Sequence, residues 1–158
     1  LSLHDALRSW TFGSGDFTVD LWFNRNGGNG TLRCLISNLD ATSALIYITL
    51  TTANVVQAFS RIGGTNESIT GTTAFTSTGW HHVAFVRTGN TLKLFVDGVQ
   101  EGGDNACSGS AYDSSSDLLI GAENGPFSFW NGWIDEVRIS KGIARWTANF
   151  TPPTEAYG

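Results

Sequence analysis

Asp135 and Glu136 are adjacent carboxylates inside the apolar, strand-like segment Gly132 to Ser140. Two carboxylates about 5 Å apart can hydrolyse a glycosidic bond, one acting as the nucleophile and the other as the acid. Adjacent residues of a β-strand, however, point to opposite faces of a sheet. We therefore expect that Asp135 and Glu136 do not form a catalytic pair, and that the chain is not an enzyme.

The three histidines, His4, His81 and His82, do not indicate nucleophilic catalysis. A serine nucleophile needs an activating base and a third carboxylate, and the sequence holds no G-x-S-x-G elbow. His81 and His82 fall inside a strand pattern, one on each face. We expect both to make structural hydrogen bonds, and we assign no catalytic residue.

Aromatic side chains in predicted loops could stack on sugar rings. The loop candidates are Trp10, Phe127, Phe129, Trp130 and Trp146, with Asn124, Asn131 and Asp113 as polar partners. The alternative is that these aromatic residues cap the ends of the core or lie in a subunit contact. Three further tryptophans, Trp22, Trp80 and Trp133, fall inside strand patterns and are interpreted as core or sheet-face residues.

The elements that position these residues are strands. Trp80 to Gln100 contains two runs in which apolar residues recur with a period of two, joined by a turn at Thr88 to Asn90 and closed by Asp97-Gly98. Similar patterns occur at 16–24, 31–38, 44–50, 54–62, 68–75, 117–121 and 132–140. In the last of these, strict alternation places Trp133, Asp135, Val137 and Ile139 opposite Ile134, Glu136 and Arg138. About ten short strands indicate an all-β, antiparallel two-sheet jelly-roll sandwich with little or no helix.

The segments between these strands are predicted as follows. Residues 1–10 read as a short strand followed by a loop or a single helical turn, and 102–116 as a long polar loop. Residues 143–146 read as one helical turn, and 147–158 as a proline-containing tail. With 158 residues and 17.0 kDa, the chain is expected to form a single domain over 1–158.

Composition excludes two classes of partner. The net charge of -5 and the scattered basic residues argue against nucleic acid, because no basic patch is available for phosphates. No run approaches the roughly 18 apolar residues of a membrane span, so membrane insertion is not expected. Only 15% of residues are charged, while Ser, Thr and Gly are abundant, which is typical of all-β proteins on a particle or cell exterior. The absence of Met and the initial Leu1 indicate a processed product or a segment of a longer polypeptide.

The two cysteines, Cys34 and Cys107, leave two readings open. Cys34 lies in a strand pattern and Cys107 in a Ser/Gly-rich stretch. A disulfide is possible in an oxidising compartment, and a core thiol together with a loop thiol is an equal alternative. No Cys-x-x-Cys spacing indicates zinc.

The order of the strand segments resembles a known family. DFTVDLWF, LISN, GWHHVAFVRTGNTLKLFVDGVQ, LLIGAENG and FWNGWIDEVRISKG look like successive signatures of laminin-G-like, concanavalin-A-like lectin/glucanase jelly-roll domains, from about Leu1 to Ala144. The ending KGIARWTANFTPPT is similar to that of such domains in bacteriophage virion surface proteins. One departure is that we expect a first strand common in the family to be absent upstream of Leu1. Either another chain supplies this strand or the sandwich does without it, and an unpaired edge would favour strand addition from a neighbour.

The resemblance implies two site chemistries to be weighed. Glucanases of this architecture carry their carboxylates as E-x-D-x-x-E on one strand, and this chain lacks that motif. Domains of the family can hold a structural Ca²⁺ through oxygen ligands, for which Asp135 is the first candidate, with Asp16, Asp20 and Asn131 as companions. The alternative for Asp135 is that it accepts backbone N–H groups of a loop. No other cofactor is expected.

The sequence therefore predicts a non-catalytic binding or assembly module on a virion or cell exterior, such as a capsid decoration, tail-fibre or adhesion domain. The alternative is a secreted carbohydrate-binding module of a larger enzyme or adhesin. The expected partners are other protein subunits, in an assembly or homo-oligomer, and glycans. The expected location is the virion surface or the extracellular space.

Overall fold

The structure, a computed structural model, describes residues 11–40, 43–125 and 127–157. The expected strand and turn over residues 1–10, with Trp10, lie outside the described residues. The regular structure consists of ten strands: β1 (Phe17–Arg25), β2 (Arg33–Ser37), β3 (Tyr47–Leu50), β4 (Val55–Ile62), β5 (Thr65–Ala74), β6 (Trp80–Thr88), β7 (Thr91–Val96), β8 (Val99–Ala106), β9 (Leu119–Ile120) and β10 (Gly132–Lys141). None of the described residues is helical, and none belongs to a helix that could span a membrane.

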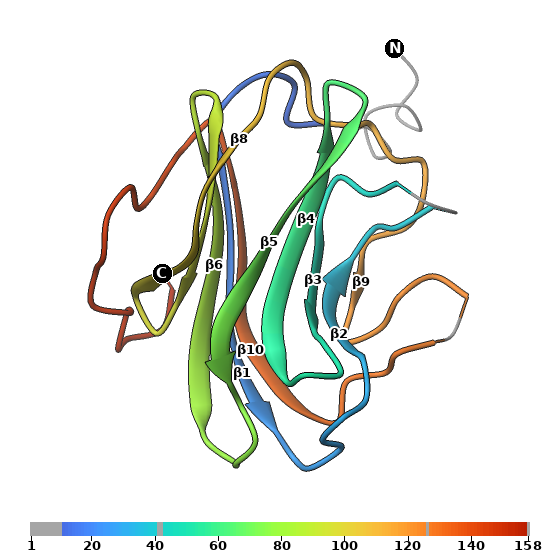
Figure 1. Cartoon of the computed structure of the whole chain (residues 1–158), viewed down its shortest axis with the longest axis vertical. Coiled ribbons are helices and arrows are strands. Elements are labelled where there is room, and N and C mark those ends of the chain that lie inside the picture. The colour runs from blue at the N-terminus through green and yellow to red at the C-terminus, as the bar shows by residue number, and fades with distance from the viewer. Residues whose placement is uncertain (1–10, 41–42, 126, 158) are drawn as a thin grey trace.

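The strands form two five-stranded antiparallel sheets that pack face to face (Figure 1). Sheet I has the order β10-β1-β6-β7-β8, and sheet II has the order β5-β4-β3-β2-β9. Strand order and chain order differ because β1 pairs with β10 and β6, and β2 pairs with β9. This arrangement confirms the predicted all-β jelly-roll sandwich.

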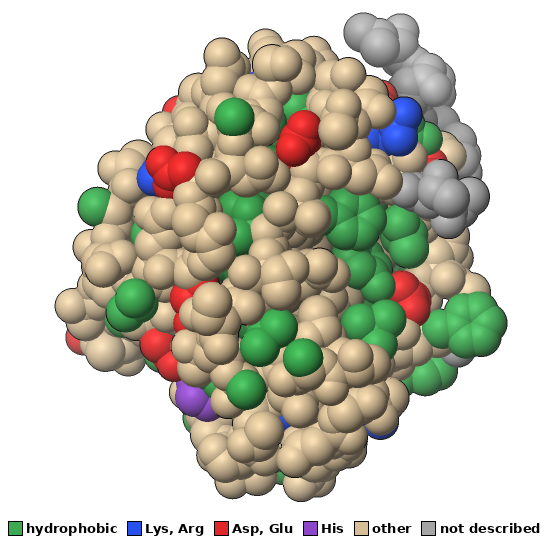
Figure 2. Space-filling view, in the orientation of Figure 1, with side chains coloured by type: hydrophobic (Ala, Val, Ile, Leu, Met, Phe, Trp, Pro, Cys, Tyr) green, Lys and Arg blue, Asp and Glu red, His purple; other side chains and the backbone are tan. Residues whose placement is uncertain are grey.

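The core lies between the two sheets and is built from the alternate positions of each strand. Phe17, Val19, Leu21 and Phe23 of β1 are fully buried and face the inner residues of sheet II. The opposite face of the same strand carries Thr18, Asp20 and Trp22, so the alternation seen in the sequence reports the orientation of β1 correctly. Low charge is visible on the face that carries β4, β5 and β8 (Figure 2), where most side chains are uncharged.

Two arginines close the opposite ends of the sandwich. Arg25 is only 2% exposed, and its guanidinium donates to the carbonyl oxygens of Gly27 and Phe75 and to Asn54 Oδ1. Arg87 is equally buried and donates to the carbonyl oxygens of Gly13, Gly89 and Gly109. Each guanidinium thus satisfies loop carbonyls at one end of the core.

The predicted loop over 102–116 is wrong for its first part, because Val99–Ala106 forms β8 against β7. Gly102 and Gly103 both have positive φ, 72° and 73°, and the β7–β8 register shifts between Leu92 and Leu94. The two glycines form a bulge within the strand. The glycine-rich composition of this segment had led to the prediction of a loop. The carboxylate of Glu101 accepts the backbone N–H groups of Thr72 and Thr73 in β5, at 2.8 and 3.2 Å, and so ties the edges of the two sheets together.

Candidate ligand-binding site

The outer face of sheet I carries three tryptophans. Asn24 of β1 pairs with Trp80 of β6 on one side and with Trp133 of β10 on the other, so all three side chains share one face. Trp22 lies two residues before Asn24 and therefore points the same way. Trp80 is 46% exposed and Trp133 is 56% exposed. The strand tryptophans were interpreted as core or sheet-face residues. Trp80 and Trp133 are sheet-face residues.

A bulge in β10 sets which residues accompany the tryptophans. Glu136 has a positive φ of 51°, and the β1–β10 register shifts so that Asp20 pairs with Arg138 but Trp22 pairs with Asp135. The predicted strict alternation in 132–140 is wrong for this reason: Val137 and Ile139 join Ile134 against the core. The expectation that Asp135 and Glu136 face opposite sides is also wrong, because both line the same pocket.

The chain after β10 runs along the outside of sheet I (Figure 1). Its first part is held by Thr18, whose hydroxyl donates to the carbonyl of Ile143 at 2.8 Å and accepts the N–H of Arg145 at 2.9 Å. Residues 143–146 have no regular structure, so the predicted helical turn there is wrong. Arg145 Nε also donates to Ser140 Oγ at 2.7 Å.

Aromatic packing holds the middle of the tail. Trp146 and Phe150 stack with their ring centroids 4.0 Å apart, and Phe150 also contacts Phe95 and His82 edge-on. The N–H of Phe150 donates to the carbonyl of Gly98 at 2.9 Å. Gly98 has a φ of 79°, and a Cβ there would overlap the Phe150 carbonyl oxygen, so only glycine fits this turn beneath the tail.

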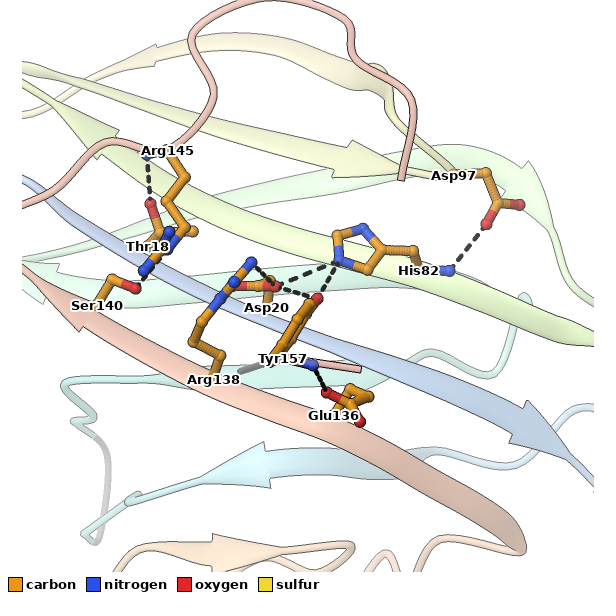
Figure 3. A network of polar contacts seen from close by, with 9 residues as sticks. All are labelled: Thr18, Asp20, His82, Asp97, Glu136, Arg138, Ser140, Arg145 and Tyr157. Carbon is orange, nitrogen blue, oxygen red and sulfur yellow. Dashed lines mark hydrogen bonds and ion pairs between the residues drawn. The ribbon is translucent and has the colours of Figure 1, made fainter. Parts of the chain in front are cut away.

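Tyr157 anchors the end of the tail in a polar network around Asp20 (Figure 3). The phenol donates to Asp20 Oδ2 at 2.6 Å, and the Tyr157 N–H donates to Glu136 Oε2 at 2.7 Å. Arg138 makes a two-pronged contact with the Asp20 carboxylate, at 3.1 and 2.9 Å, and its guanidinium lies 3.6 Å from the Tyr157 ring centroid. The network therefore joins the tail to β1, β6 and β10.

The network also fixes protonation states. Burial alone would raise the pKa of Asp20, but hydrogen bonds from His82, Arg138 and Tyr157 outweigh it and hold the pKa below its ordinary value of 3.8. Burial and the bond to Asp20 raise the pKa of the Tyr157 phenol. His82 Nε2 lies 3.2 Å from the Tyr157 oxygen, whose own proton goes to Asp20, so Nε2 is the donor. His82 Nδ1 is buried with no partner among the described residues.

The tail and the tryptophan face together line an open pocket of about 370 Å³. The sheet contributes Trp22, Trp80, Asp135 and Glu136, and the tail contributes Pro153, Thr154, Glu155 and Ala156. Asp135 Oδ1 accepts the N–H of Glu136 at 2.8 Å, while Glu136 holds the Tyr157 backbone. Two aromatic rings and three carboxylates surround a space large enough for a small ligand.

The structure divides the aromatic residues predicted to bind a ligand. Phe127 and Phe129 lie in the loop between β9 and β10 and are 67% and 54% exposed. Trp130 is half-buried, packs edge-on against Phe23 and donates its Nε1–H to the Trp133 carbonyl, so it caps the core. Trp146 lies in the tail on sheet I, where it stacks on Phe150, and is not part of that loop.

Two of the predicted polar partners, Asn131 and Asn124, form hydrogen bonds with neighbouring loops. Asn131 donates to the Asn26 carbonyl at 2.7 Å, and Asn124 reaches Ser116 Oγ at 3.5 Å. Both contacts tie loop segments together. The sequence argument did not predict ligand contacts for Trp22 or Trp80. The available signal was that Trp22 shares its strand face with Asp20, and Trp80 with His82, while the apolar core positions occupy the other face.

The three carboxylates predicted to bind calcium lie at separate places. Asp16 accepts the Gly89 N–H at 2.7 Å, at the far end of β1 from the pocket. Asp20 is buried in the tail network, and Asp135 lines the pocket. The described parts of the chain bring no three His, Cys, Asp or Glu side chains together in a way that suits a metal ion. These residues do not fit one shared calcium ion in this arrangement.

Two further sequence hypotheses are resolved by the geometry. His81 Nδ1 lies 2.7 Å from Asp97 Oδ2, and the His82 N–H donates to Asp97 Oδ1, so the expected structural hydrogen bonds of the histidines are confirmed. Cys34 and Cys107 are both free and buried. Cys107 packs in the main core and Cys34 in a smaller cluster with Tyr47, over the outer side of β2 to β4.

A sandwich of two antiparallel sheets with an open, aromatic-lined site on one outer face defines the class of lectin-like β-sandwich domains. The chain belongs to the concanavalin A-like lectin/glucanases superfamily, whose laminin-G family model matches residues 2–145. A comparison with curated proteins found no match.

Solved structures share the fold at low sequence identity. A candidate carbohydrate-binding protein from Bacteroides ovatus matches with a TM-score of 0.66 and 18% identity, over 85% of this chain and 39% of that chain. Domains LG4-5 of the mouse laminin alpha1 chain match with 0.65 and 17%, over 85% of this chain and 38% of that chain. The CBM40 of Ruminococcus gnavus IT-sialidase bound to alpha2,6 sialyllactose matches with 0.65 and 13%, over 86% and 81%. The chain thus spans only 39% and 38% of the first two proteins.

Proposed function

We propose that this chain is a non-catalytic carbohydrate-binding module that holds a sugar in the pocket between Trp22, Trp80 and the C-terminal tail. The observation that carries the proposal is the pairing of these two rings with the carboxylates of Asp135 and Glu136 in one pocket. The apolar face of a sugar ring stacks on tryptophan, and its hydroxyls donate to carboxylates. Trp133 extends the aromatic surface beyond the pocket, next to Asn24.

A binding role without hydrolysis is supported by the backbone hydrogen bonds that these carboxylates accept. Glu136 holds the Tyr157 N–H, and Asp135 holds the N–H that follows it in the bulge. A retaining glycosidase would need a free nucleophile and a protonated acid about 5 Å apart. Family membership and the carbohydrate ligand of the CBM40 structure agree with a sugar-binding role but do not specify it.

The first experiment is a glycan array, followed by calorimetric titration of the best glycan. Trp80→Ala should weaken binding by roughly 2- to 13-fold, because stacking on one aromatic ring contributes about 0.5–1.5 kcal/mol. The matched controls are Phe127→Ala and Phe129→Ala, which remove exposed rings outside the pocket. Loss of binding in these two variants with full binding by Trp80→Ala would place the site in the β9–β10 loop instead. Release of sugar from the bound glycan would contradict the non-catalytic role.

A second candidate function is attachment to a protein subunit. Ile120, Phe127 and Phe129 are more than half exposed and belong to β9 and the loop after it. Exposed apolar residues close together are typical of protein contacts. Light scattering tests this candidate: a stable multimer that Phe127→Asp converts to a monomer would support it, and a monomer at all concentrations would refute self-association.

The exterior setting is part of the same proposal. We place the module in the extracellular space or on a virion surface, as the capsid decoration, tail-fibre or adhesion domain expected from the sequence. The low content of charged residues supports this setting. Recovery of the full-length protein from purified particles or from culture medium would distinguish the two, and recovery from neither would refute both.

A further inference from the structure

The tail wall of the pocket lies beyond the residues that the family model matches. The match covers residues 2–145, whereas Pro153, Thr154, Glu155 and Ala156 form one side of the pocket. We propose that this wall makes the pocket selective for sugars that carry a protonated amine. The inference rests on the proposed carbohydrate binding and names the class of sugar.

Charge is the first reason. Asp135 and Glu136 from β10 and Glu155 from the tail all line the pocket, and its lining holds no Lys or Arg among the described residues. Arg138 belongs to the same strand, but its guanidinium is committed to Asp20. The chain as a whole carries a net charge of -5. A cationic ligand therefore enters a field of one sign, and an anionic sugar is repelled.

The aromatic rings are the second reason, and they are independent of the carboxylates. Trp22 and Trp80 line the same pocket, and a tryptophan face attracts a cation as well as the apolar face of a sugar ring. A sugar ring that bears an ammonium group contacts both kinds of residue in the pocket: its carbon face stacks on tryptophan and its ammonium group pairs with a carboxylate. A neutral sugar uses only the first of these contacts.

The wall is fixed before the ligand arrives. Tyr157 follows the lining residues directly and is held by Asp20 Oδ2 at 2.6 Å and by Glu136 Oε2 at 2.7 Å. Pro152 and Pro153 further restrict the backbone on the other side of Thr154. The backbone of Glu155 therefore keeps its place on the pocket wall, which lowers the ordering cost of binding.

The experiment compares two glucosamine oligosaccharides of equal length, one fully N-acetylated and one fully deacetylated. Calorimetric titrations are run at a mildly acidic pH, where the sugar amine is protonated and ordinary carboxylates stay ionised. The deacetylated oligosaccharide should bind about tenfold more tightly. Glu155→Gln should remove most of this advantage, while the control Asp117→Asn, on the approach to β9 in sheet II, should keep it. Raising the salt concentration should reduce the advantage as well.

Three results would overturn the inference. Equal binding of the two oligosaccharides, lost in both cases on Trp80→Ala, would leave the proposed carbohydrate binding intact and refute the amine selectivity. Equal binding of a simple alkyl diamine would show that no sugar ring is recognised. If Asp117→Asn weakens binding of the deacetylated oligosaccharide as much as Glu155→Gln does, the attraction is a non-specific one to an acidic protein. Failure of every glycan on the array would refute the proposed function itself.

Discussion

The phenol oxygen of Tyr157 lies 2.6 Å from Oδ2 of Asp20, across a separation of 137 residues. Asp20 is fully buried on the outer face of β1, so this contact covers a carboxylate that would otherwise face solvent. It also brings residues 153–156 against Trp22 and Trp80. One hydrogen bond thus links the packing of the tail to the shape of the pocket.

Removing the phenol should loosen the tail. We expect Tyr157→Phe to lower the free energy of unfolding by about 1–2 kcal/mol, because a hydrogen bond to a buried carboxylate is lost while the ring stays on Arg138. Urea denaturation measures this change, and proteolytic cleavage of the chain after residue 150 should become faster. The control is Tyr112→Phe, which removes a similar 2.6 Å bond to Asp40 away from the tail. Equal effects of the two variants on tail proteolysis would contradict the anchoring role of Tyr157.

Acid should release the tail through Asp20. The pKa of this carboxyl is lower in the folded state than its ordinary value of 3.8, so folding favours the ionised form. The resulting stabilisation is complete above pH 3.8 and is lost as the pH falls through the lowered folded pKa. A carbon-13 NMR titration of the Asp20 carboxyl measures this directly. A folded pKa at or above the ordinary value would show that burial outweighs the three hydrogen bonds.

The sheets could be predicted from the sequence because their signal is local. The alternation in Phe17 to Arg25 and in Trp80 to Val96 assigns each side chain to a face, and turn residues such as Asp97-Gly98 mark the hairpins. The apolar period is strong on the inner face, where burial is complete. For this reason the fold class and most strands were predicted correctly.

The pocket could not be predicted in the same way, because it depends on a backbone irregularity and on a long-range contact. A positive φ at Glu136, a residue type that rarely adopts it, turns two adjacent carboxylates toward one pocket. The tail gives no periodic pattern, and its position depends on Asp20 and Thr18, more than a hundred residues away. Trp80 was read as part of a strand, and the exposure that makes it a ligand candidate appears only in three dimensions.

Arg25 should be important for stability although its guanidinium bonds to Gly27, Asn54 and Phe75 and to no acidic side chain among the described residues. Arg25→Met removes the donors that satisfy the Gly27 and Phe75 carbonyls at one end of the core, and should cost about 2–4 kcal/mol in unfolding free energy. The matched control is Arg61→Met at a half-buried position of β4, which should change stability by less than about 0.5 kcal/mol. Thermal unfolding followed by circular dichroism compares the two. A loss below 1 kcal/mol for Arg25→Met would mean that water replaces the guanidinium at these carbonyls.

The two thiols should be present but unreactive in the folded protein. Burial, with the negative charge of Glu123, raises the pKa of Cys34 to about 12, and burial also raises the pKa of Cys107. Because the thiolate is the reactive form, an aromatic disulfide reagent should titrate no thiol in buffer and two in denaturant. Finding no thiol in denaturant without reductant would show that Cys34 and Cys107 are oxidised, contrary to their placement in separate clusters.

Chelation should leave the fold unchanged. Calcium takes 6–8 oxygen ligands, yet Asp16 holds a backbone N–H, Asp20 holds Arg138 and Tyr157, and Asp135 lies at the pocket away from both. The midpoint of thermal unfolding should therefore be the same in EDTA and in millimolar calcium. An ion present at a hundred times its dissociation constant would stabilise the protein by about 2.7 kcal/mol, which corresponds to a rise of roughly 5–10 °C in the midpoint. A rise of that size, abolished by Asp135→Asn and kept by Asp117→Asn, would show that Asp135 coordinates calcium and that the pocket wall includes a metal site.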